Sequence, residues 1–139
     1  MVAAYDLFIS YSHSDLGWVN EFADRLGRAG LRVARDQIVL RPGAVLLHAV
    51  EQAIRNSAHG LLVFSPASVA SGWVQQEYVT LMSRSIERKQ LFIPVLIGAV
   101  TIDDLPEFAR SRYFADFRRV SSAQYGKLVS DIAEAVLGT

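Results

Sequence analysis

The 139-residue sequence predicts a single α/β domain built on a parallel sheet, and three observations lead to this fold class. Short β-rich segments alternate with amphipathic segments along the chain, some of the β-rich segments are apolar throughout, and 51% of the residues are hydrophobic. Such alternation is typical of parallel sheets with right-handed crossovers and helices on both faces. The chain is long enough for one hydrophobic core, so we expect residues 1–139 to form one domain, which can be a module of a longer protein.

The predicted strands are short runs of β-branched, aromatic or aliphatic residues that polar or turn-forming residues interrupt. Runs that are apolar at nearly every position, such as 60–64, predict strands buried on both faces. In chain order the predicted strands cover residues 5–10, 31–35, 60–64, 91–97 and 113–117.

The predicted helices are the segments in which apolar residues recur every three or four positions. Gly30 is a typical stop for the first of them, and Ser121 with Gln124 resembles a capping box that opens the last. Because Pro42 and Gly43 break regular structure, the segment that precedes the second helix is expected to be a loop. In chain order the helices are expected over residues 18–26, 45–54, 72–86 and 121–136, with a further turn near 105–110.

Five strands connected in this way commonly adopt the doubly wound, flavodoxin-like order 2-1-3-4-5. In that order the topological switch lies between the first and third strands, and ligands bind beyond their carboxyl ends. The loops at this point are residues 11–15 and 65–71, with the start of the 72–86 helix beside them. The fold class alone therefore predicts a ligand site in one small region.

Composition excludes several classes of protein. The balance of 14 basic and 14 acidic residues argues against binding to nucleic acid or to a membrane surface. The absence of cysteine excludes disulfides and thiolate metal sites, and the three histidines lack metal-ligand spacing, so we expect no metal and no resident cofactor. No apolar run is long enough to span a bilayer and no signal-peptide pattern is present, so a cytoplasmic location is expected.

Trp73 and Glu77 form the most informative pair of residues. They are separated by four positions in a predicted helix, so they lie on one face about one turn apart, and this helix starts at the predicted ligand edge. Two interpretations stay open from the residues alone. Trp73 is a core residue and Glu77 a solvated charge, or both belong to a binding site.

Four motifs, in order along nearly the whole chain, resemble those of Toll/interleukin receptor (TIR) domains. They are Tyr5–Ser12 as box 1, Asp36 with Arg41, Pro42 and Gly43 as box 2 (the BB loop), Ser65-Pro66 and Ser71-Gly72-Trp73 with Glu77 as the CC loop and following helix, and residues 91–95 as the fourth strand. Box 3 departs from the family pattern, because only Phe114 and Phe117 stand where a Phe-Trp pair is expected. This departure argues for a bacterial-type member rather than an animal receptor.

The resemblance implies an NAD glycohydrolase in which Glu77 promotes cleavage of the nicotinamide–ribose bond. It further implies that the substrate NAD is bound by Trp73, Tyr11, Ser12, His13 and Asp36. Attack by water gives ADP-ribose, whereas internal attack gives a cyclic isomer, and the sequence does not distinguish the two. The family also implies a role in bacterial defence or effector signalling.

The alternative function is a non-catalytic interaction module, because TIR domains also associate with other TIR domains. The predicted self-association residues of the BB loop are Ile38, Val39, Leu40, Arg41, Pro42 and Gly43. The apolar run at its start either packs into the core or forms a contact surface, on which a homo-oligomer or filament depends. A third class, a flavin or nucleotide binder of the same topology, lacks a recognisable phosphate loop in this sequence.

Overall fold

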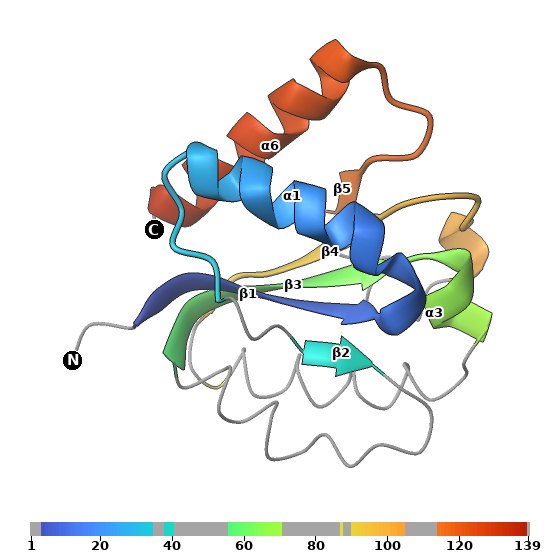
Figure 1. Ribbon diagram of the computed structural model, residues 1–139, viewed down its shortest axis with the longest axis horizontal. Coiled ribbons are helices and arrows are strands. Elements are labelled where there is room, and N and C mark those ends of the chain that lie inside the picture. Colours follow the sequence, from blue (N-terminus) through green and yellow to red (C-terminus); the bar gives the residue numbers. More distant parts are fainter. Residues whose placement is uncertain are drawn as a thin grey trace.

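The computed structural model describes residues 4–34, 38–40, 56–70, 87, 90–104 and 114–138. These residues contain one five-stranded sheet in which all neighbouring strands are parallel (Figure 1). The strands are β1 (Tyr5–Ser12), β2 (Ile38–Leu40), β3 (Ser57–Phe64), β4 (Phe92–Leu96) and β5 (Ala115–Asp116). The described helices are α1 (Leu16–Arg28), α3 (Pro66–Ala70) and α6 (Ser122–Leu137), with the 3₁₀ turns η1 (His13–Asp15) and η2 (Ile102–Asp104).

The strand order is β2-β1-β3-β4-β5, the same order as the predicted 2-1-3-4-5, although β2 is not the segment predicted as the second strand. The two eight-residue strands, β1 and β3, are paired with each other and lie inside the sheet. The shortest strands, β2 and β5, lie at its edges.

The second strand begins later in the chain than predicted. In the predicted strand 31–35, the described residues form only an isolated bridge, Leu7 to Val33, with β1. Ile38–Leu40, predicted as part of a loop, is instead β2 and pairs with the last three residues of β1. The prediction was wrong because it followed the breaker Pro42-Gly43, which lies outside the described residues, rather than the β propensity of the apolar run.

Helices α1 and α6 lie side by side over one face of the sheet (Figure 1). Alternate residues of the strands point to this face, as the two-residue period of a strand requires. Leu7, Ile9 and Tyr11 of β1 belong to the resulting core cluster, together with the apolar stripes of both helices. Trp18 of α1 is only partly buried there, but its ring packs against Phe22, at a centroid distance of 4.7 Å.

Local signals account for the ends of these two helices. The chain leaves α1 through Gly30, whose φ of 103° favours glycine, as predicted for a helix stop. At the start of α6, the predicted capping box is confirmed, because the Gln124 amide donates to Ser121 Oγ and the Ser121 amide donates to Gln124 Oε1. No helix in the described part of the chain is long and apolar enough to cross a membrane.

The opposite face of the sheet is buried as well. Phe8, Leu62, Phe64 and Leu96 point to it and are at most 1% exposed. Gly60 is required here, because a side chain at this position would collide with the ring of Phe8. The helices predicted over 45–54 and 72–86 lie outside the described residues. Helices were predicted on both faces of the sheet. Of these two layers, the described residues show the one that α1 and α6 form.

Candidate functional site

The carboxyl ends of β1 and β3 lie at the switch point of the sheet. From β1 the chain continues to β2 on one side, and from β3 it continues to β4 on the other. The two strands run parallel, with Ile9 opposite Leu61, so the segments that follow β1 and β3 leave the sheet at the same edge (Figure 1). Doubly wound sheets bind ligands at this position. The two loops predicted to form the site, after β1 and after β3, therefore meet there.

The carboxyl end of β1 and the turn η1 after it carry three of the predicted NAD-binding residues. Ser12 is half-buried and His13 is exposed, so both are accessible at the edge of the sheet. The Ser12 hydroxyl makes no capping bond to η1. Tyr11 differs from them, because it is 3% exposed and belongs to the core cluster under α1 and α6. Its side chain packs inside the domain, so the ring of Tyr11 is not placed to contact substrate.

The loop after β3 is held by two buried serine residues. The Ser65 amide donates to Ser68 Oγ at 2.8 Å, and the Ser68 amide donates to Ser65 Oγ at 3.1 Å. The Ser68 hydroxyl also donates to the Ser65 carbonyl, which accepts a further bond from the Val69 amide. This reciprocal arrangement starts α3 directly at the end of β3, and α3 contacts both β1 and β3.

A hydrogen bond between side chains connects the two loops. The Ser65 hydroxyl donates to Asp15 Oδ2 at 2.5 Å across fifty positions of sequence. Burial raises the pKa of the Asp15 carboxyl, and the bond from Ser65 partly opposes this shift. Sequence reasoning placed both residues in or beside the site loops but did not predict their contact. The visible signal was an aspartate directly before an amphipathic helix, which indicates an N-cap rather than a contact with another loop.

The other predicted site residues are placed only in part. Glu77, Trp73 and Asp36 lie outside the described residues, as do the last three residues of the BB loop motif, 41–43. The apolar start of that motif, Ile38–Leu40, forms β2, and Leu40 pairs with Ser12 at the carboxyl end of β1. The described structure therefore brings β2 and the loops after β1 and β3 to one edge.

A hollow of about 360 Å³ lies at the same edge of the sheet, beyond β4 and β5. Its lining includes Arg118, whose guanidinium donates to both carboxylate oxygens of Asp116 at 2.8 Å and to the Val100 carbonyl at 2.9 Å. The bond from Arg118 lowers the pKa of the Asp116 carboxyl. The carboxylate is thus already neutralised by its own neighbour, and sequence reasoning had not singled out this region.

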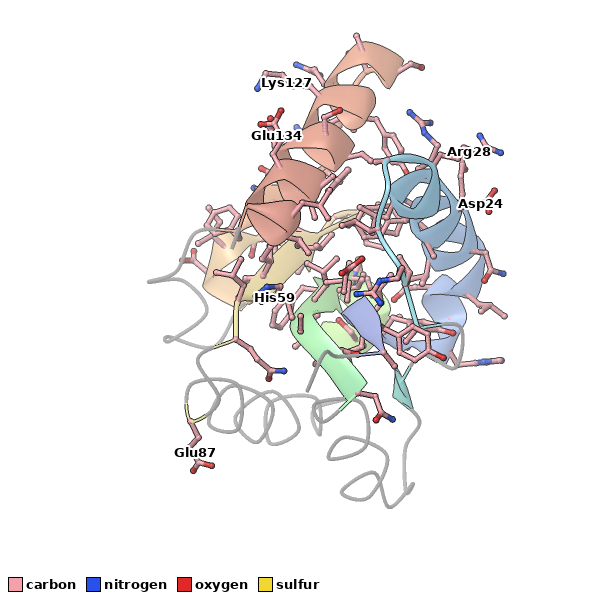
Figure 2. The ribbon with its side chains drawn as sticks, turned by 90° about the vertical axis from the view of Figure 1, so that its left-hand side faces the viewer. Asp24, Arg28, His59, Glu87, Lys127 and Glu134 are labelled. Atoms are coloured by element: carbon pink, nitrogen blue, oxygen red, sulfur yellow. The ribbon has the colours of Figure 1, made fainter. Side chains whose placement is uncertain are left out.

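Metal binding finds no support among the described residues, which contain no group of three or more histidine, cysteine, aspartate or glutamate side chains able to hold an ion. His59 lies in β3 within the body of the domain (Figure 2). Its Nδ1 accepts a hydrogen bond from the Leu91 amide, and burial lowers its pKa. His59 is therefore a histidine held within the sheet, far along β3 from the switch-point edge.

Comparison with known proteins places this geometry in context. The family model for the TIR domain matches residues 7–129. An NAD(+) hydrolase, TcpA, of a Theionarchaea archaeon is 32% identical over 106 residues, which are 76% of this chain and 32% of that protein. The 2′ cyclic ADP-D-ribose synthase AbTIR of Acinetobacter baumannii is 29% identical over 92 residues, 66% of this chain and 34% of that protein. The chain thus spans about a third of these curated relatives.

Among solved structures, a metazoan TIR-STING receptor from C. gigas superposes with a TM-score of 0.68 at 27% identity. The match covers 92% of this chain and 40% of the receptor chain. The similarity therefore extends over nearly the whole domain.

Proposed function

The chain belongs to the TIR domain family, and on that premise we propose that it is an NAD glycohydrolase that cleaves the nicotinamide–ribose bond. One observation supports the proposal most: the loops after β1 and β3 meet at the switch point in a chain whose relatives include proteins named for NAD hydrolysis and for cyclic ADP-ribose synthesis. The reaction requires no added cofactor, since NAD is itself the substrate.

The chemistry needs a single carboxylate, and Glu77 is our candidate. Nicotinamide leaves as a neutral molecule from a cationic pyridinium, so no acid has to protonate the leaving group. O-glycosidases need a pair of carboxyl groups for their reaction, whereas here one is sufficient. Glu77 binds ribose hydroxyls and stabilises the developing oxocarbenium charge. This role rests on the Ser71-Gly72-Trp73 motif with Glu77, which lies outside the described residues.

The remaining candidates orient the substrate. Trp73 stacks on the pyridinium, where a cation over an indole contributes roughly 0.5–2 kcal/mol. Ser12 and His13, both accessible at the edge, contact the nucleotide from the end of β1 and the turn after it, and Asp36 contacts it from the BB loop side. Tyr11 contributes by packing beneath this loop, since its side chain belongs to the core.

Self-association completes the proposal. The apolar run of the BB loop begins in β2, an edge strand, and an apolar segment at an edge suits contact with a second copy of the chain. A head-to-tail contact of this kind can grow into a filament. We propose that such assembly activates the domain within a cytoplasmic defence or effector system. If the domain does not cleave NAD, the same surface supports the alternative of a non-catalytic TIR–TIR module.

The direct test is to incubate the purified domain at high concentration with NAD and to follow the products by chromatography. We expect release of nicotinamide together with ADP-ribose or a cyclic isomer, and the retention of the second product identifies which nucleophile attacks. A folded domain that releases no nicotinamide at any concentration would overturn the enzymatic proposal in favour of the interaction module.

A further inference from the structure

Asp15 occupies an unusual position for the bond that it makes. It stands at the N-cap of α1, where an aspartate side chain commonly accepts a bond from the first turn and contributes about 1 kcal/mol to helix stability. The Asp15 carboxylate makes no such capping bond. It accepts instead the Ser65 hydroxyl, which belongs to the loop after the neighbouring strand β3. The side chain therefore serves a contact between loops rather than its own helix.

The bond to Asp15 also determines the orientation of the Ser65 hydroxyl. A serine hydroxyl has one proton to donate, and here that proton points to Asp15 Oδ2. The oxygen simultaneously accepts the Ser68 amide at the first turn of α3. Ser65 is 1% exposed and Ser68 is fully buried, so the bonds between these two serines are shielded from water, whereas the bond to Asp15 is partly buried. The start of α3 is thus tied through one hydroxyl to the end of η1.

The arrangement keeps a carboxylate partly buried beside a neutral donor. In the described part of the chain, Asp15 forms no ion pair, and its bond partner is Ser65 alone. Removing a charge from water without a cationic partner is unfavourable for stability. A side chain that lowers stability and lies where the sheet binds ligands is characteristic of residues that serve function.

We infer that Asp15 is a positioning residue of the candidate NAD site: through the Ser65 hydroxyl it fixes the loop after β3 against the loop after β1. This inference rests on the proposed function. Ser12 and His13 stand on one side of the connection, and the end of β3 with the start of α3 stands on the other. A misplacement of about 1 Å between parts of an active site lowers the rate on the order of 100-fold. The connection therefore controls turnover without contact between Asp15 and the reacting atoms.

The first experiment compares kinetics of three variants with the wild type. Asp15→Ala removes the acceptor, Asp15→Asn keeps an acceptor oxygen without the charge, and Asp24→Ala is the matched control. Asp24 lies on the outer surface of the same helix, where it pairs with Arg28 (Figure 2). At a temperature where circular dichroism shows every variant folded, we expect Asp15→Ala to lower kcat on the order of 100-fold with little change in KM. Asp15→Asn should recover part of the loss, and Asp24→Ala should match the wild type.

A second kinetic test uses the partner residue. If the two side chains act through one bond, Ser65→Ala combined with Asp15→Ala should be no slower than the slower single variant, rather than showing the product of both losses. Folded Asp15→Ala with wild-type kcat would overturn the inference, as would full multiplicative losses in the double variant.

Hydrogen exchange supplies a readout that does not depend on NAD. In Asp15→Ala the amides of Ser68 and Val69 should exchange about tenfold faster than in the wild type, whereas Asp24→Ala should leave them unchanged. Unchanged exchange in Asp15→Ala would show that Asp15 does not fix the loop after β3, whatever the activity. If the wild type does not cleave NAD but these amides exchange faster in Asp15→Ala, the proposed function and the catalytic role of Asp15 are refuted. The same result would still establish that Asp15 fixes the loop after β3.

Discussion

Two carboxylates at the same edge of the sheet have different partners, and their pKa values are shifted in opposite directions. Asp116, at the end of β5, is bonded to the Arg118 guanidinium through both oxygens, and its pKa is lowered. Asp15, after β1, accepts the neutral Ser65 hydroxyl, and burial raises its pKa. A carboxylate with an arginine partner stabilises a turn, whereas one held without a cation is available for a role in the site. The contrast separates a structural side of the edge from a functional one.

We expect the largest loss of activity from substitutions in the BB loop. Gly43→Arg and Leu40→Asp should each remove NAD cleavage, because a bulky residue disturbs the loop conformation that glycine permits and a charge opposes an apolar contact. Leu137→Asp is the matched control, since Leu137 is 56% exposed near the carboxyl end of α6. Specific activity measured over a wide dilution range should fall as the wild type is diluted. A flat dilution profile with fully active loop variants would mean that the site is complete within one chain.

The two tryptophans provide the next comparison. Trp18 packs against Phe22, Phe117 and Tyr125. Trp18→Ala should therefore lower the free energy of unfolding by about 2–4 kcal/mol, measured by urea denaturation, while the remaining folded protein keeps its kcat.

Trp73→Ala should show the reverse pattern. We expect folding to stay intact while kcat/KM falls about tenfold, with Trp73→Phe milder because a smaller aromatic ring retains part of the stacking. If Trp73→Ala unfolds the domain as Trp18→Ala does, Trp73 is a core residue and not a substrate contact.

The smallest expected effect is a difference in pH dependence between the two carboxylates. The pKa of Asp116 is lower in the folded state than its unfolded value near 3.9, so its contribution to stability is present above about pH 4 and is lost as the pH falls through the folded pKa. Asp116→Asn should cost about 1 kcal/mol at pH 7 and less in acid, measured by urea denaturation from pH 3 to pH 7.

Asp15 has the opposite sign. Because its pKa is raised in the folded state, that state binds the proton more tightly, and stability decreases as the pH rises from about 4 through the folded pKa. Relative to the wild type, Asp15→Asn should therefore become more favourable as the pH rises through this window. Parallel pH profiles for Asp15→Asn and Asp116→Asn would remove the distinction between the two sides of the edge.

Much of the fold could be predicted because its signals are local. The apolar stripe of α1, the stop at Gly30 and the capping box of α6 follow from spacing and residue type. The strand order followed from the alternation of strands and helices. The second strand was misplaced because the prediction followed the breaker Pro42-Gly43 rather than the apolar run Ile38–Leu40, which pairs with the end of β1.

The candidate site was predicted in location but not in its contacts. Tyr11 follows the same alternation as Leu7 and Ile9, and this period of two explains why its ring is in the core rather than in the site. The bond between Asp15 and Ser65 joins residues fifty positions apart, so only the register of β1 and β3 reveals it. The roles of Glu77 and Trp73 stay predictions, since both lie outside the described residues.

Glu77 is proposed as the one carboxylate with which this domain cleaves NAD, and nicotinamide release by the Glu77→Gln variant tests this role most directly. The control is Glu87→Gln, because Glu87 is a glutamate that is exposed at the surface. At matched high protein concentration, we expect the wild type and Glu87→Gln to release nicotinamide at the same rate, and Glu77→Gln to release it at least about 1,000-fold more slowly while remaining folded. A folded Glu77→Gln domain with wild-type activity would show that Glu77 is not the carboxylate that promotes NAD cleavage.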